Sequence, residues 1–259
     1  MFKLNNPIKK WAACRVWVIG ASEGIGLALA QELIKLGSEV TVSARNENRL
    51  REIYSDKARI RALDVSKLSD CENLLAEFSR DKSTPDIVFW LPAMYQPLPI
   101  FEEDGSLSNQ IITTNLTSAF HVLPSIVRTW CKKRETDKNT HLHWIWFSSL
   151  AAYGGLPNAA DYGASKAGLM HLSETSYIEL RKKGINVTLV SPGFVDTRLT
   201  RKNTFHMPFI IPSQKAALLT LRGLSKGQYE IHFPKTMSLI FKLFRLLPRA
   251  LYFRLARFL

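Results

Sequence analysis

The sequence is poor in cysteine and in long apolar runs. Its three cysteines, Cys14, Cys71 and Cys131, are too few and too scattered for a disulfide framework, and no pair has zinc-ligand spacing. We therefore expect a reducing, cytoplasmic environment and no metal site. No apolar stretch reaches the ~18 residues of a membrane-spanning helix. The basic first 20 residues lack a separate apolar core, so we expect a strand there rather than a signal peptide.

Acidic residues are also in short supply. The chain has 22 Asp and Glu against 35 Lys and Arg, which gives a formal net charge of +13. Such a charge attracts phosphates, lipid headgroups or nucleic acid without choosing among them. Internal repeats, low-complexity tracts and linkers are absent. With 46% hydrophobic residues among 259, the chain can bury a sizeable core.

Short β-rich segments alternate with segments of helical periodicity. Several of the β-rich segments are apolar on both faces, which is typical of a parallel sheet covered on both sides. We predict an α/β fold, a single doubly wound Rossmann-type domain with about seven parallel strands and helices on both faces, whose ligands bind beyond the carboxyl ends of the strands. The expected strands are 14–20, 39–44, 59–65, 86–91, 141–149, 185–191 and 229–233, and the expected helices are 24–36, 46–56, 66–81, 107–131 (kinked at Pro124), 161–183 and 213–225.

A glycine-rich stretch, GASEGIG (20–26), stands where the first strand gives way to the first helix. Gly20 and Gly24 permit a tight turn and a close ligand approach, while Gly26 lets the helix pack on the sheet. Amides at the helix N-terminus can then meet a pyrophosphate. An ordinary βα turn is the alternative, but the strand–turn–helix context favours a dinucleotide loop. We expect cofactor contacts from Gly20, Ser22, Glu23, Gly24, Ile25 and Gly26.

The residues after the second strand bear on the choice of cofactor. An acidic residue there usually binds a ribose 2′-hydroxyl, whereas a 2′-phosphate needs a cation. This chain has Arg45 at that point and no carboxylate before Glu47. The Arg45 guanidinium can bind a phosphate through two parallel N–H donors, so we predict NADP(H) in preference to NAD(H). The alternative is a solvated loop arginine, since Arg49 and Arg51 lie close by.

Three residues further along indicate proton-transfer chemistry. Tyr162 and Lys166 are four apart, so they share one helical face. A phenol with a pKa near ~10 exchanges protons poorly at neutral pH. We expect the Lys166 ammonium to lower the Tyr162 pKa and to have donors left for a ribose. Ser149, at the end of a strand, could bind a substrate oxygen. Each residue alone is more often structural, but together they predict a proton donor for carbonyl chemistry.

With these motifs in place, the chain resembles the short-chain dehydrogenase/reductase family over roughly residues 12–235. The resemblance implies a catalytic tetrad. Tyr162 would be the general acid/base, Lys166 would tune it and bind the nicotinamide ribose, and Ser149, selected over Ser148 by its spacing from Tyr162, would orient the carbonyl. Asn115 would hold a water in the proton relay. The matching segments are GASEGIG, LDV (63–65), NLTSAF (115–120), Ser149, YGASK (162–166) and SPGFVDT (191–197).

The resemblance also extends the cofactor site, and one segment departs from it. Asp64 and Val65 would flank the adenine, and the nicotinamide end would be lined by Pro192, Gly193, Val195 and Thr197. After the fourth strand the family usually has Asn-Asn-Ala-Gly, whereas this chain has LPAM (91–94). Ala93 alone matches and is expected to keep its backbone contact with the cofactor. The change puts sheet stability and cofactor affinity in question.

Asn115 has a second interpretation that does not depend on the resemblance. It lies in a segment otherwise rich in apolar and small residues, where a side-chain amide needs a partner. A hydrogen bond to a neighbouring backbone group would satisfy it. This role and the role in a proton relay are compatible.

The last segment, 236–259, differs in composition from the predicted domain over 1–235. Leu and Phe are frequent in it, and Pro248 is expected to divide it. We predict a basic amphipathic helical tail. It could lie on anionic lipid at the inner face of the membrane, or it could pack on its own domain or across an oligomer interface. Nucleic acid is not expected, because no binding motif accompanies the charge. The basic residues of the tail region are Lys235, Lys242, Arg245, Arg249, Arg254 and Arg257.

Together these features predict an NADPH-dependent carbonyl reductase, or the reverse alcohol dehydrogenase, assembled as a homodimer or homotetramer. The small-molecule substrate is expected to be hydrophobic, because the segment over 194–212 is apolar. The alternative is a low-activity cofactor-sensing or scaffolding module of the same fold, suggested by LPAM. The apolar side chains of the segment are Phe194, Phe205, Met207, Phe209 and Ile210.

Overall fold

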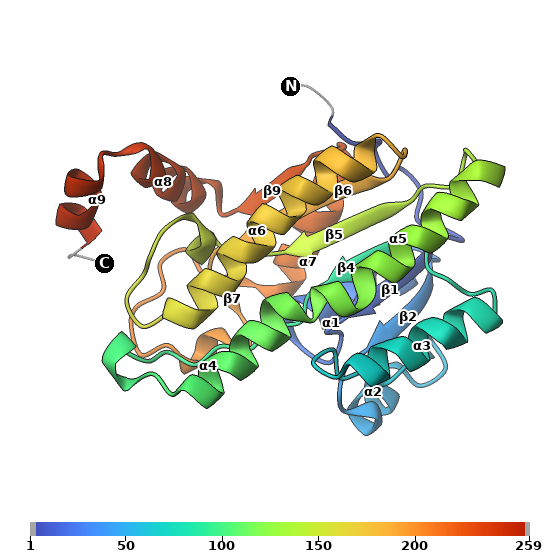
Figure 1. Ribbon diagram of the computed structural model, residues 1–259, viewed down its shortest axis with the longest axis horizontal. Helices are drawn as coiled ribbons and strands as arrows, with labels where there is room; N and C mark the ends of the chain where they lie inside the picture. The colour runs from blue at the N-terminus through green and yellow to red at the C-terminus, as the bar shows by residue number, and fades with distance from the viewer. Residues whose placement is uncertain (1–3, 257–259) are drawn as a thin grey trace.

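The computed structural model describes residues 4–256. Within them, a sheet of seven parallel strands has the order β3-β2-β1-β4-β5-β6-β9 (Figure 1). This arrangement confirms the predicted doubly wound α/β fold. Strand order reverses between β1 and β4, where such folds bind ligands. The strands are β1 (Arg15–Ile19), β2 (Glu39–Ser43), β3 (Arg59–Ile60), β4 (Ile87–Trp90), β5 (His143–Phe147), β6 (Asn186–Pro192) and β9 (Glu230–Phe233).

Helices cover both faces of the sheet because alternate strand residues point to opposite sides. In β1, Val16 and Val18 pack in one core with α1, α2 and α7, while Trp17 and Ile19 pack in the other with α3, α5 and α6. Both cores are almost wholly apolar. The helices are α1 (Gly24–Lys35), α2 (Glu47–Tyr54), α3 (Leu68–Arg80), α4 (Gly105–Ile112), α5 (Ala119–Thr136), α6 (Ala160–Arg181), α7 (Ser213–Leu224), α8 (Lys235–Leu246) and α9 (Arg249–Ala256).

Two expected elements differ from the structure. The strand predicted over 59–65 is shorter, since β3 is an edge strand that ends at Ile60, although the Arg61 and Leu63 amides still donate to the Val42 and Ala44 carbonyls. The helix predicted over 107–131 is interrupted by a π-helical turn at Thr113–Thr117. Pro124 lies inside α5, which continues through it. A small second sheet, β7 (Val195–Asp196) with β8 (Ile211–Pro212), was not predicted.

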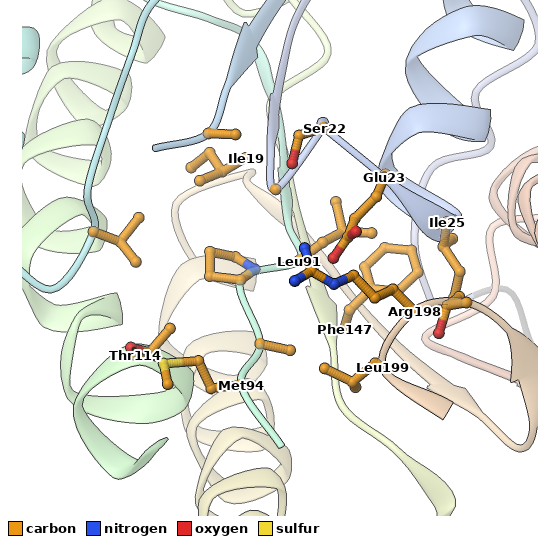
Figure 2. A pocket seen from close by; sticks show the side chains of 18 of the residues that line it. Ile19, Ser22, Glu23, Ile25, Leu91, Met94, Thr114, Phe147, Arg198 and Leu199 are labelled. Atoms are coloured by element: carbon orange, nitrogen blue, oxygen red, sulfur yellow. Dashed lines mark hydrogen bonds between the residues drawn. The ribbon is translucent and has the colours of Figure 1, made fainter. Parts of the chain in front are cut away.

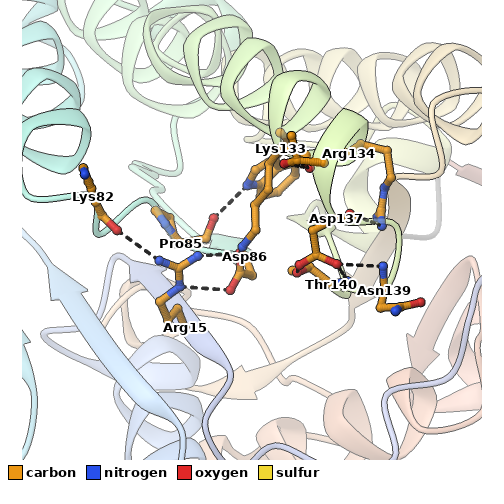
Figure 3. A network of polar contacts seen from close by, with 11 residues as sticks. Arg15, Lys82, Pro85, Asp86, Lys133, Arg134, Asp137, Asn139 and Thr140 are labelled. Carbon is orange, nitrogen blue, oxygen red and sulfur yellow. Dashed lines mark hydrogen bonds and ion pairs between the residues drawn. The ribbon is translucent and has the colours of Figure 1, made fainter.

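The amino-terminal edge of the sheet is held by ion pairs (Figure 3). Asp86 accepts from the Arg15 guanidinium, with Nε–Oδ2 and Nη2–Oδ1 distances of 3.0 Å each. Lys133 of α5 lies 2.6 Å from the same carboxylate. The partly buried cluster joins β1, β4 and α5 at the edge opposite the carboxyl ends.

A buried histidine pair makes the fold sensitive to acid. His141 Nε2 lies 3.1 Å from His143 Nδ1, and His143 Nε2 lies 2.8 Å from Thr188 Oγ1. Burial lowers the pKa of His141 from 6.5 to about 4 and holds that of His143 well below 6.5. The unfolded chain therefore binds protons first as the pH falls below about 6.5, and stability declines in that window.

We predict that the free energy of unfolding falls by about 1–2 kcal/mol between pH 7 and pH 5 through His141 alone. Thermal unfolding at the two pH values measures the loss. The variant His141→Gln should show a smaller decline than the wild type, whereas His171→Gln, at an exposed position on α6, should behave as the wild type. An equal decline in all three proteins would contradict the assignment.

Candidate active site

A cavity of about 540 Å³ opens at the carboxyl ends of the parallel strands (Figure 2). It runs from the turn between β1 and α1, past the ends of β2 and β4, to the ends of β5 and β6. Its size suits a small-molecule or cofactor site. With the exception of Asn115, every site residue predicted from the sequence lines it: Gly20, Ser22, Glu23, Gly24, Ile25, Gly26, Arg45, Asp64, Val65, Ala93, Ser149, Tyr162, Lys166, Pro192, Gly193, Val195 and Thr197.

The glycine loop forms one wall and has a conformation that requires glycine. Gly20 and Gly24 have φ values of +91° and +56°, which side chains other than glycine rarely adopt. A Cβ on Gly26 would lie 2.1 Å from the Gly20 carbonyl oxygen. The loop therefore brings its backbone to the start of α1, where free amides can bind an anion.

The end of β2 contributes cationic side chains. Arg45 lies two residues after β2, is solvent-exposed and lines the cavity. Arg49 of α2 lines the same region, but its guanidinium also pairs with Glu52 at 3.2 Å. Asp64 lines the opposite side, and its Oδ1 accepts from the Ser66 amide and hydroxyl. The cavity thus has two arginines where the sequence predicted a phosphate contact.

Ser149, Tyr162 and Lys166 meet at the other end of the cavity. Ser149 follows β5, and its Oγ accepts from the Ala151 amide at 3.2 Å. Tyr162 and Lys166 lie one turn apart near the start of α6, and the Lys166 Nζ is 5.7 Å from the Tyr162 ring centroid. The Ser148 hydroxyl donates to the Lys166 carbonyl at 2.8 Å. Ser148 is therefore engaged in structure, and Ser149 lies at the cavity beside Tyr162.

The pKa values here differ from the expectation. Burial raises the pKa of Tyr162 to about 12, although a hydrogen bond with Ser149 opposes the rise. Burial also lowers the pKa of Lys166 to about 7. The prediction that Lys166 lowers the Tyr162 pKa is wrong for this state, because the amine donates to the Phe147 carbonyl at 3.1 Å. Tyr162 is thus a protonated phenol at neutral pH, the form that donates a proton.

Asn115 lies outside the cavity lining and is fully buried in the π-helical turn. Its Oδ1 accepts from the Met94 amide at 2.6 Å, and its Nδ2 donates to the Met94 carbonyl at 2.9 Å and to Ser165 Oγ at 3.0 Å. The contact with a neighbouring backbone, one of the two interpretations of Asn115, is therefore confirmed. The water-holding role stays a prediction.

The LPAM segment keeps its place despite its composition. The Leu91 amide donates to the Ile19 carbonyl at 3.1 Å, which extends the pairing of β4 with β1. Met94 is fixed through its backbone by Asn115, and its Sδ accepts from Thr114 Oγ1 at 3.3 Å. Leu91, Ala93 and Met94 line the cavity. The absence of the two asparagine side chains usual in this segment thus does not break the pairing of β4 with β1 at this point.

Some lining residues were not predicted. Arg198, Leu199 and Thr200 follow Thr197 and close the cavity beside the glycine loop. Figure 2 shows the Arg198 guanidinium extending across the cavity toward Glu23. A cation directly after SPGFVDT was the available signal, but the sequence prediction gave Arg198 no role. Tyr95 was also missed, and its ring centroid lies 4.8 Å from that of Tyr162.

A family model described as short chain dehydrogenase matches residues 15–207. The chain belongs to the short-chain dehydrogenase family. Among curated proteins of this kind, an uncharacterized oxidoreductase of Myxococcus xanthus is 29% identical over 93% of this chain and 95% of that protein. The 3-oxoacyl-[acyl-carrier-protein] reductase FabG of Rickettsia bellii is 30% identical over 82% of this chain and 81% of that protein.

Solved structures support the fold of this short-chain dehydrogenase. A short chain dehydrogenase from Burkholderia cenocepacia in complex with NADP superposes with a TM-score of 0.82, at 21% identity, over 95% of this chain and 98% of that chain. The protein is therefore an oxidoreductase with a Rossmann-type nucleotide-binding fold, and its family binds a nicotinamide cofactor.

Two further findings concern membranes and metals. No helix within residues 4–256 combines the length and apolarity needed to cross a bilayer. In the same part of the chain, no three His, Cys, Asp or Glu side chains are grouped so that they could hold a metal ion.

Proposed function

We propose that this short-chain dehydrogenase is an NADPH-dependent carbonyl reductase, which acts in reverse as an alcohol dehydrogenase. The main support is that Ser149, Tyr162 and Lys166 line one continuous cavity with the glycine loop and Arg45. A hydroxyl, a phenol and an amine therefore stand at one end of a space whose other end suits a dinucleotide phosphate.

The residues present fit a nicotinamide dinucleotide. The positive φ values of Gly20 and Gly24 and the absence of a side chain at Gly26 leave room for a pyrophosphate against the loop. Arg45 stands where a 2′-phosphate would be read and forms no ion pair within residues 4–256. This supports NADPH over NADH. Bound NADPH would supply the hydride.

The chain's own residues would supply and position the proton. Tyr162, a protonated phenol at neutral pH, would donate to the carbonyl oxygen as charge develops on it. The Ser149 hydroxyl would donate a hydrogen bond to the same oxygen. Lys166, whose Nζ lies 5.7 Å from the Tyr162 ring centroid, would bind the nicotinamide ribose beside the reacting groups.

The substrate side is apolar, which supports a hydrophobic carbonyl compound. Outside the cavity lining itself, the rings of Phe194 and Phe205 meet edge to face at 5.8 Å beyond β6, and the Tyr95 ring lies 4.8 Å from that of Tyr162. The Tyr95 hydroxyl donates to Asn203 Oδ1 at 3.0 Å, which joins the loop after β4 to the segment over 194–212.

We also expect a cytoplasmic homodimer or homotetramer. Measurements of molecular size would test the oligomeric state, and cell fractionation would test the localisation.

The proposal predicts NADPH oxidation by the purified protein in the presence of an apolar aldehyde, ketone or 3-oxoacyl thioester. The absorbance of NADPH, followed against a panel of such compounds and of short hydrophilic ones, measures it. Turnover should favour the apolar members. Tight NADPH binding without turnover on any member would instead support the alternative of a cofactor-sensing or scaffolding module.

A further inference from the structure

The C-terminal helices are seated on the domain by a few specific contacts. Ser238 of α8 is fully buried, and its Oγ lies 2.5 Å from His232 Nδ1 of β9. Lys242 pairs with Glu230 at 2.5 Å. In α9, the buried Tyr252 donates to the Gly155 carbonyl at 2.8 Å. One side of the tail therefore packs on the chain's own domain, which was one of the predicted alternatives.

The opposite side of the tail exposes a row of large apolar side chains. In α8, Leu239, Leu243 and Leu246 are spaced three and four residues apart, so they share one helical face, and they are 55%, 62% and 80% exposed. In α9, Leu251 and Phe253 are 44% and 60% exposed. Leu251 and Phe253 are two residues apart and so point to different sides of α9, but both α8 and α9 expose large apolar side chains. Exposed apolar side chains gathered in this way usually mark an interaction site. We call these residues, with Ile240 and Leu255, the outer face of the tail.

Uncompensated positive charge surrounds the outer face. No Asp or Glu follows Glu230 in the sequence. Lys242 is neutralised by Glu230, but Lys235, Arg245, Arg249 and Arg254 form no ion pair with any carboxylate of residues 4–256. Arg257, the last basic residue predicted for the tail, lies outside the described residues.

We propose that the outer face of the tail docks on an anionic phospholipid surface. Leucine and phenylalanine would enter the interface between headgroups and acyl chains, and the arginines would meet lipid phosphates. With 12 and 8 residues, α8 and α9 are too short to span a bilayer and would lie along its surface. A second copy of the chain fits less well, because it would bring the same basic tail to a protein of net charge +13.

The contacts that hold the tail on the domain also determine the orientation of the cavity relative to the lipid surface. Figure 1 shows α8 and α9 on the same side of the molecule as the start of α6, the helix end to which Tyr162 belongs. α8 packs against the turn Leu150–Tyr153, which follows Ser149 directly. A Cβ on Gly154 would come within 2.7 Å of the Tyr252 hydroxyl. Because the tail is fixed to the loop after Ser149, docking would hold the cavity in a set orientation near the lipid surface. The docking itself does not depend on the proposed reaction.

Sedimentation of the full chain with vesicles tests the proposal. We expect most of the protein to pellet with vesicles that contain about one third phosphatidylglycerol in phosphatidylcholine, and little with phosphatidylcholine alone. The double variant Leu243→Glu/Leu246→Glu should abolish binding. The matched control Leu36→Glu/Leu218→Glu changes net charge equally, at a position 45% exposed just after α1 and one 51% exposed on α7, and it should bind as the wild type. Arg249→Gln and Arg254→Gln should each lower binding about fivefold.

Several outcomes would overturn the proposal. These are an absence of binding to either vesicle, equal binding to both, or undiminished binding by Leu243→Glu/Leu246→Glu. Sedimentation velocity supplies another outcome: if the wild type is an oligomer and this variant a monomer, the outer face joins copies of the chain. Circular dichroism of the variants confirms that they are folded, and because both altered leucines are exposed, the helices should remain intact.

Discussion

Replacing Tyr162 by phenylalanine should lower kcat for carbonyl reduction by about 10²- to 10⁴-fold, the usual contribution of a general acid. The substitution removes a hydroxyl and leaves the ring that contacts Tyr95. The cavity should therefore keep its shape, and the loss should fall on the chemical step. Single-turnover oxidation of NADPH, measured with the most active carbonyl compound of the panel, gives the rate of that step.

The Tyr162→Phe result is informative only if cofactor binding persists. Fluorescence titration with NADPH should give a Kd within about threefold of the wild type, since the glycine loop and Arg45 are unchanged. The control is Tyr177→Phe, farther along α6, whose hydroxyl donates to the Leu4 carbonyl. It should retain full activity. A fully active Tyr162→Phe would remove the proposed mechanism.

Replacing Arg45 by glutamate should raise the Kd for NADPH by about 10- to 100-fold and leave that for NADH nearly unchanged. A charge-assisted hydrogen bond to the 2′-phosphate would be lost, and a repulsive carboxylate would be added at the same place. NADH carries a 2′-hydroxyl at that position, and this hydroxyl can donate a hydrogen bond to the introduced carboxylate. The ratio of the two dissociation constants, measured by titration, is the decisive quantity.

Two comparison variants sharpen the Arg45 test. Arg128→Glu, exposed on α5, changes the net charge equally and should affect both cofactors alike and weakly. Arg49→Glu should have the smaller effect of the two cavity arginines, because its guanidinium is already shared with Glu52. If Arg45→Glu weakens both cofactors equally, Arg45 does not read the phosphate.

The fold was predictable because its signals are local. Strands with apolar residues on both faces, such as Trp144 and Ile145 in β5, are fully buried in opposite cores, as a covered parallel sheet requires. The glycine loop and the Tyr162–Lys166 spacing are equally local, so their shared cavity followed from the topology. Strand length at the sheet edge depended instead on how far β3 keeps regular pairing with its single neighbour β2, which periodicity does not record.

The features that were missed depend on contacts between distant segments. The π-helical turn around Asn115 accompanies the bonds of its amide with Met94, 21 residues away. The pKa of Tyr162 depends on its burial, and the amine of Lys166 is directed by the Phe147 carbonyl. The seat of Tyr252 against Gly155 could not be read from an amphipathic pattern either, since that pattern shows a face and not its partner.

The bonds between Asn115 and Met94 have a consequence for how such chains are recognised. At residue 94, Asn115 bonds to the main-chain N–H and C=O, so these two bonds do not depend on which side chain residue 94 carries. The side chain at residue 94 can therefore change without loss of these two bonds. A search pattern written around the amides and glycine of that loop would overlook sequences like this one, whereas a pattern anchored on the asparagine at 115 would retain them.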